Sequence, residues 1–246
     1  MSEEQQPTAL ARPGLALPTN LTLPGNVRFT DFNDGSVKMF DFENYKGVKG
    51  RTDRIGILFP EMIAAARTHF VPDGGYVLCQ SEFKEVGGND VIVRMAPCCE
   101  KLREPRKRFA AMIIQYRTDK DGNLLKPLSY DLKVWTFGPD KYIELRSLNA
   151  EFPLAAHDLR LTCTDDNFQK LTIQTCRESV VGVEAFQREF GQAVIDWATA
   201  TVPKLHRAVG KTLTPVELAE KLGAAGAAPM SMVESSPALD ISDLLT

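Results

Sequence analysis

The segment from Arg108 to Phe137 reads RFAAMIIQYRTDKDGNLLKPLSYDLKVWTF and decides the fold expected for this chain of 246 residues. The stretch Arg108–Arg117 has the length and the side-chain alternation of a strand. Asp119–Asn123 has the Asp-, Gly- and Asn-rich composition of a turn, and Tyr130–Phe137 alternates again as a strand. This part of the sequence therefore predicts two strands joined through a turn.

The residues around this segment extend the pattern. Gly138-Pro139 indicates the start of a helix, because proline is tolerated in the first helical turn. Two alternating segments, 158–164 and 169–177, flank a turn and predict a hairpin, while 54–60 is an extended apolar run upstream. Strand, strand, helix and hairpin predict a closed or nearly closed barrel of about five strands, for which the oligonucleotide/oligosaccharide-binding (OB) fold is the commonest nucleic-acid binder.

Helical periodicity begins after Val180. An apolar stripe every three or four residues predicts a helix that ends before Pro203, and its members are Phe186, Phe190, Val194 and Trp197. A second helix is expected from Thr214, whose hydroxyl can cap the amide of Glu217 while Glu217 bonds back. The expected class is mainly β with C-terminal helices, an α+β fold. The helices are expected to pack on the barrel, and partner binding is the alternative.

The composition along the chain divides it into four parts. We expect a flexible arm over 1–25, an OB-fold core over 26–178, two helices over 179–223 and a disordered acidic tail over 224–246. The tail contains no Lys or Arg, which leaves it acidic at its end.

Charge is unevenly distributed although the net charge is only −3. Residues 46–146 contain 18 Lys/Arg against 13 Asp/Glu, a balance of +5 that leaves −8 for the rest. A basic core with acidic flanks suits a protein whose ends compete with a polyanion, and chance scatter of surface charge is the alternative. No run approaches the roughly 20 apolar residues of a membrane span, and no signal peptide is evident, so a cytoplasmic protein is expected.

Five cysteines in a reducing compartment favour thiols or metal ligands over disulfides. Zinc in structural sites prefers four tetrahedral nitrogen and sulfur donors. The sequence offers such a set, with glycine pairs in the intervening loops, in His69, Cys79, Cys98 and Cys99. We predict a structural zinc site from these four residues. The alternative is a plain histidine with small buried thiols.

A dense group of cations precedes the first strand of the opening segment. Such a strip can follow phosphates, and flat rings on the strands can stack on bases. The predicted nucleic-acid-binding residues are Arg94, Lys101, Arg103, Arg106, Lys107, Arg108, Tyr116, Lys133, Trp135 and Phe137. The alternatives are a solvated basic loop and rings that belong to the barrel core.

The order of these features is similar to a known family. An apolar strand ending in Pro60, the His and Cys set, the basic strip, Val134–Gly138 and His157–Thr162 together resemble the bacteriophage-type replicative single-stranded DNA-binding proteins over residues 50–178. The resemblance implies an OB fold with an inserted zinc subdomain, here about 60–105, and an acidic C-terminal tail. One departure is that the family's site contains a Cys-x-x-Cys knuckle, whereas Cys98 and Cys99 are adjacent.

The resemblance implies a protein without enzymatic activity that coats single-stranded DNA in phage replication, recombination and repair, in the cytoplasm of an infected bacterium. It also implies recruitment of replication and recombination proteins by the tail residues Asp240, Asp243, Leu244 and Leu245, and allows self-association on DNA. An alternative is a phage transcription or assembly accessory factor that contacts a polymerase. A further alternative is a thiol enzyme using Cys98 or Cys99 with His69 or His157, for which no motif provides a third group.

Overall fold

The computed structural model describes residues 15–21, 23, 43–71, 75–86, 89–102, 104–165 and 170–225. Most of the predicted arm and all but two residues of the predicted tail lie outside these ranges. The strands are β1 (Thr52–Ile57), β2 (Ala64–Val71), β3 (Gly75–Leu78), β4 (Glu82–Val86), β5 (Asn89–Arg94), β6 (Arg106–Tyr116), β7 (Tyr130–Phe137), β8 (Leu159–Cys163) and β9 (Leu171–Thr175). The helices are η1 (Pro60–Met62), α2 (Pro97–Lys101), α3 (Pro139–Glu151), α4 (Glu184–Thr201), η2 (Val202–Val209) and α5 (Pro215–Ala225).

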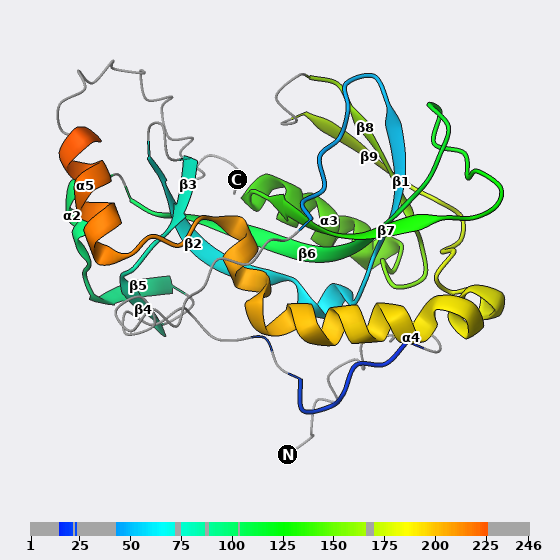
Figure 1. The fold of residues 1–246 in the computed structure, drawn as a ribbon, viewed down its shortest axis with the longest axis horizontal. Coiled ribbons are helices and arrows are strands. Elements are labelled where there is room, and N and C mark those ends of the chain that lie inside the picture. The colour runs from blue at the N-terminus through cyan, green and yellow to red at the C-terminus, as the bar shows by residue number, and fades with distance from the viewer. Residues whose placement is uncertain are drawn as a thin grey trace, which may run out of the picture.

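The fold is α+β, and β6 is the central strand of its main sheet (Figure 1). One edge of β6 pairs with β7 over the whole length of that strand. Its other edge pairs first with β2 and then with β1, so that the seven strands follow the path β3-β2-β6-β1-β8-β9 with β7 attached to β6. All strand pairs are antiparallel. The hairpin β4–β5 forms a separate small sheet.

Side-chain alternation along β6 divides the interior into two cores. One face of the strand, carrying Met112 and Ile114, packs against α4 and η2, which cover the sheet in Figure 1. The other face, carrying Phe109 and Ile113, packs against β1, β8 and the region of α3. Both faces are therefore covered, which explains why the middle of β6, from Phe109 to Ile114, is an unbroken apolar run. The stripe predicted for the C-terminal helix is α4, and it points into the first core.

The main sheet does not close into the predicted five-stranded barrel. Among the described residues, no pairing joins β7 to β9, the two strands that would have to meet. Residues 43–45 occupy the edge of β7 instead: the Tyr45 amide donates to the Val134 carbonyl, and the Val134 amide donates to the Glu43 carbonyl, each at 2.9 Å. The closed OB barrel is therefore not confirmed, because a preceding segment takes the hydrogen bonds that closure requires.

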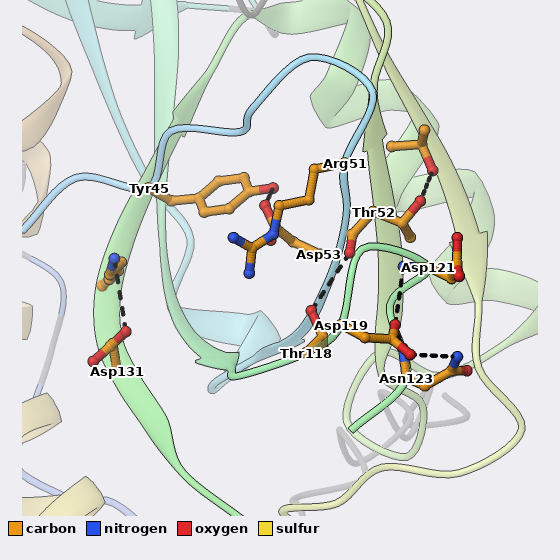
Figure 2. Close-up of polar contacts among 11 residues, drawn as sticks. Tyr45, Arg51, Thr52, Asp53, Thr118, Asp119, Asp121, Asn123 and Asp131 are labelled. Atoms are coloured by element: carbon orange, nitrogen blue, oxygen red, sulfur yellow. Dashed lines mark hydrogen bonds and ion pairs between the residues drawn. The ribbon is translucent and has the colours of Figure 1, made fainter. Parts of the chain in front are cut away.

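This preceding segment is held in place by a buried polar contact, drawn in Figure 2. The Tyr45 hydroxyl donates to Asp53 Oδ2 at 3.1 Å, and Arg51 Nε lies 3.0 Å from the other oxygen of Asp53. The Tyr45 ring meets Trp135 edge to face, with centroids 6.2 Å apart. Burial, together with the Asp53 carboxylate, raises the pKa of Tyr45, so the hydroxyl remains a donor. The segment 43–45 is thus held against β7 by a buried hydrogen bond and a ring contact.

Three local predictions are confirmed by the hydrogen bonds. In the turn after β6, Asp119 Oδ1 accepts the amides of Asp121 and Asn123, each at 2.9 Å (Figure 2). At α5, the Thr214 hydroxyl accepts the Glu217 amide at 3.2 Å while the Glu217 carboxylate accepts the Thr214 amide at 2.7 Å. Strands β8 and β9 form the predicted hairpin.

A small lobe at one end of the main sheet contains β3, the β4–β5 hairpin, α2 and α5 (Figure 1). It has its own apolar cluster, to which Val71 and Val77 contribute from the hairpin β2–β3 and Leu218 and Leu222 from α5. Helix α5 therefore packs mainly on this lobe, whereas the sequence suggested that both C-terminal helices cover a barrel. No helix among the described residues has the length and apolarity needed to cross a membrane.

Candidate metal centre and basic cleft

The small lobe brings together the four predicted metal ligands. His69 lies on β2, and Cys79 follows β3 directly. The ladder pairs His69 with Val77, and the Cys79 amide continues it by donating to the Arg67 carbonyl at 2.8 Å. Cys98 and Cys99 come from the short helix α2, which begins at Pro97. An antiparallel hairpin and one helical turn thus supply two donors each.

The donor atoms have the spacing of a four-coordinate site. Cys79 Sγ lies 3.4 Å from Cys99 Sγ and 3.9 Å from Cys98 Sγ, and Cys99 Sγ lies 3.5 Å from His69 Nε2. All four donor atoms fall within 4.8 Å of one another. A tetrahedron with metal–sulfur distances of about 2.3 Å has edges of about 3.8 Å, so the cluster matches the size of such a site. Both sulfurs of the adjacent pair Cys98 and Cys99 lie in the cluster, although the pair departs from the Cys-x-x-Cys spacing of the family.

The surroundings of the thiols favour negative charge on one sulfur. Hydrogen bonds from Cys79 and from His69 lower the pKa of the Cys98 thiol, although burial opposes this. The hydrogen bond to Cys98 and burial raise the pKa of Cys79, and burial raises that of Cys99. Ser81 supports the cluster from outside, because its hydroxyl donates to Cys99 Sγ at 3.0 Å and accepts the Ala96 amide at 2.8 Å. A cation bound among them would favour the thiolate form of all three sulfurs.

A cleft of about 960 Å³ opens where β7 and β9 fail to meet. Its walls come from the start of β6, the end of β7, the start of α3, residues 44–46 and the hairpin β8–β9. Among the described residues, the lining contains one carboxylate residue, Asp140. The described lining also contains six cationic residues, which are Lys46, Arg106, Lys107, Arg108, Lys141 and Lys170. The cleft is therefore strongly basic in a chain whose net charge is negative.

Three of these cations are exposed to a ligand. Lys46, Arg106 and Lys170 are exposed, and within the part of the chain that the structure describes none of them has a carboxylate within 4 Å. Lys141 is committed to the fold, because it pairs with Glu144 and donates to the Leu171 carbonyl at 2.7 Å. That contact ties the start of α3 to β9 across the cleft.

The structure gathers only part of the predicted basic strip at the cleft. Arg106, Lys107 and Arg108 line it. The other cations lie elsewhere: Arg94 faces Glu82 on the hairpin β4–β5, and Lys133 pairs with Glu43 at 2.9 Å. Lys101 is exposed on α2 and is not among the lining residues. Arg103 lies outside the described residues, as do the predicted partner-binding residues Asp240, Asp243, Leu244 and Leu245.

The three rings predicted to stack on bases belong to the core. The exposed fraction is 0% for Tyr116, 1% for Trp135 and 4% for Phe137. Tyr116 packs under α4, while Trp135 and Phe137 pack in the second core and form the floor of the cleft. None of them offers a free face, so the stacking prediction is corrected. Alternation placed these rings on a face, but the elements that cover the face come from distant parts of the sequence.

Sequence reasoning missed an exposed ring at the cleft, Tyr76. Its side chain lines the cleft, and the Arg108 guanidinium carbon lies 3.8 Å from its ring centroid. The alternation of an apolar strand could have found it, since Tyr76 precedes the buried Val77 and therefore points to the opposite side.

Comparison of the chain with protein-family models, with curated proteins and with solved structures finds no match.

Proposed function

We propose that this protein binds single-stranded DNA without sequence preference, with the cleft holding the phosphates and zinc stabilising the small lobe. The observation that carries the proposal is the charge of the cleft, whose described lining has six cationic residues and one carboxylate. Cationic grooves that follow a phosphate backbone are the common feature of proteins that bind single strands regardless of sequence. The acidic remainder of the chain makes this local concentration of positive charge more notable.

The lining of the cleft favours a single strand over a duplex. One aromatic ring that is exposed to solvent, Tyr76, lies beside the cations of the lining. A duplex presents phosphates outside and stacks its bases inside, whereas a single strand presents both phosphates and apolar base faces. A groove with both kinds of surface therefore suits an unpaired strand.

The four clustered ligands fit zinc. Histidine with three cysteines is a donor set typical of structural zinc sites, and four protein donors leave no position for water or substrate. Zinc would be held by His69, Cys79, Cys98 and Cys99 and would supply folding free energy to the lobe. A lobe of this size has a small core, so such a contribution would be large for it.

We also propose that the sheet is an OB-type sheet left open on one side. Its strands β1, β6, β7, β8 and β9, with α3 inserted before β8, follow the expected sequence of elements. In OB folds the second and third strands form the binding face, and these correspond to β6 and β7, which line the cleft. The family resemblance then supports a role in phage replication and recombination, with the acidic tail recruiting other proteins.

Titration of the full chain with fluorescently labelled oligonucleotides, followed by anisotropy, tests the proposal. We expect binding that strengthens with oligonucleotide length, is similar for mixed and homopolymeric sequences, and is weaker for a duplex of the same length. Metal analysis by mass spectrometry on the same sample should give one zinc per chain. Absence of binding to any oligonucleotide at low salt would refute the proposed function.

A further inference from the structure

We propose that Phe70, Tyr76 and Arg108 form a base-stacking platform beside the basic cleft. This inference rests on the proposed function and deepens it, because it assigns the recognition of unpaired bases to residues outside the cleft floor. The buried rings of β6 and β7 cannot perform this role.

Phe70 and Tyr76 are exposed rings in contact with each other. The exposed fraction is 63% for Phe70 and 43% for Tyr76. They are directly opposite across the hairpin β2–β3, and their centroids lie 5.5 Å apart at an interplanar angle of 71°. Two adjacent aromatic side chains in water are unfavourable for a protein without a ligand for them. Bases offer such a ligand, since every base has a flat apolar face.

Arg108 connects the ring pair to the phosphate-binding cations. Its guanidinium lies over one face of Tyr76, while Phe70 meets the same ring edge to face, so a cation and two rings are grouped at one place on the surface. Arg106 lies two residues before it on the same face of β6 and is exposed in the cleft. A strand with a phosphate on Arg106 therefore has its bases beside Phe70 and Tyr76.

The hairpin holds the two rings rigidly. The neighbours of the rings point the opposite way, with His69 joining the metal ligands and Val77 joining the apolar cluster of the small lobe. The free edge of β3 is covered, because the Lys211 amide donates to the Tyr76 carbonyl at 2.8 Å and the Leu78 amide donates to the Lys211 carbonyl at 2.9 Å. A platform fixed in this way loses little conformational entropy when a base stacks on it.

Binding of a normal and an abasic oligonucleotide of equal length tests the platform, because only the normal one can stack. The variants are Phe70→Leu, Tyr76→Leu and Tyr76→Phe, with Phe152→Leu as a matched control at a ring that is exposed outside the cleft. Each Leu variant should bind the normal strand about 5- to 150-fold more weakly, because that is the loss in affinity that corresponds to the usual stacking free energy of one ring. The Leu variants should bind the abasic strand with unchanged affinity. Tyr76→Phe and the control Phe152→Leu should bind the normal strand with unchanged affinity.

A Tyr76→Trp variant gives a second readout, since its new indole fluorescence should be quenched by the normal strand and not by the abasic strand. Unchanged affinity of both Leu variants for the normal strand, or equal losses on the normal and abasic strands, would overturn the platform while leaving DNA binding intact. If the unaltered protein binds neither strand, the proposed function fails and the platform fails with it. Zinc content and thermal unfolding of each variant establish that its lobe is folded.

Discussion

The proposed DNA binding predicts a salt dependence that is set by the number of cations in the cleft. Six cations belong to its described lining, and Lys141 is engaged by Glu144, so at most five of them contact phosphates. For a single strand the logarithm of the binding constant falls with the logarithm of the salt concentration with a slope of about −0.7 per phosphate, so five contacts predict about −3.5. A fourfold rise in salt, from 50 to 200 mM, should then weaken binding by about 100-fold.

The double variant Arg106→Gln, Lys107→Gln removes two of these cations without introducing negative charge. The slope should fall to about −2.1, and the same rise in salt should weaken binding only about 20-fold. The assay is anisotropy of a labelled homopolymeric oligonucleotide over a series of salt concentrations. The control is Arg188→Gln, because Arg188 is exposed on α4 and does not line the cleft. An unchanged slope in the double variant, or an equal change in the control, would show that phosphates do not follow the cleft.

Three further predictions concern the framework around the cleft. Removal of metal by a chelator, or the substitution Cys79→Ser, should lower the thermal stability of the small lobe, measured by calorimetry. Either change should also weaken binding of the normal strand, because the hairpin that carries Phe70 and Tyr76 also carries His69. Unchanged stability after metal loss would contradict this. Asp158→Ala should lower the free energy of unfolding, measured in urea, by about 3–5 kcal/mol. The substitution leaves Arg54, the Ser179 hydroxyl and the Val180 amide without their buried acceptor. A loss below about 1 kcal/mol would count against this. Thr214→Ala should destabilise the start of α5 by about 1 kcal/mol, which speeds amide hydrogen exchange there and leaves exchange in α4 unchanged. An equal change in the exchange rates of both helices would argue against a local cap.

The candidate metal centre lies between two parts of the lobe. The same hairpin presents His69 on its inner face and the exposed ring pair on its outer face. Helix α5 packs on the apolar cluster that contains Cys79 and Cys98. A metal ion bound by the four residues would therefore stabilise both the hairpin that carries the rings and the packing of α5.

The sequence by itself determined the features that depend on neighbouring residues. The turn at Asp119, the cap at Thr214, the hairpin β8–β9 and the apolar stripe of α4 all follow from local backbone preferences and from periodicity. The members of the His and Cys cluster could also be predicted, because few residue types supply soft metal donors and the chain has few of them.

Only the tertiary structure decided which faces are covered and where the sheet stops. Alternation puts Trp135 on one face of β7 and Tyr76 on one face of β3. It does not predict that Tyr45 and the second core bury Trp135, or that Tyr76 stays in contact with water. The open side between β7 and β9 arises because residues 43–45 take the hydrogen bonds of β7. Burial and strand closure depend on contacts between segments far apart in the chain. The free energy of such contacts cannot be read from the local sequence pattern of either segment.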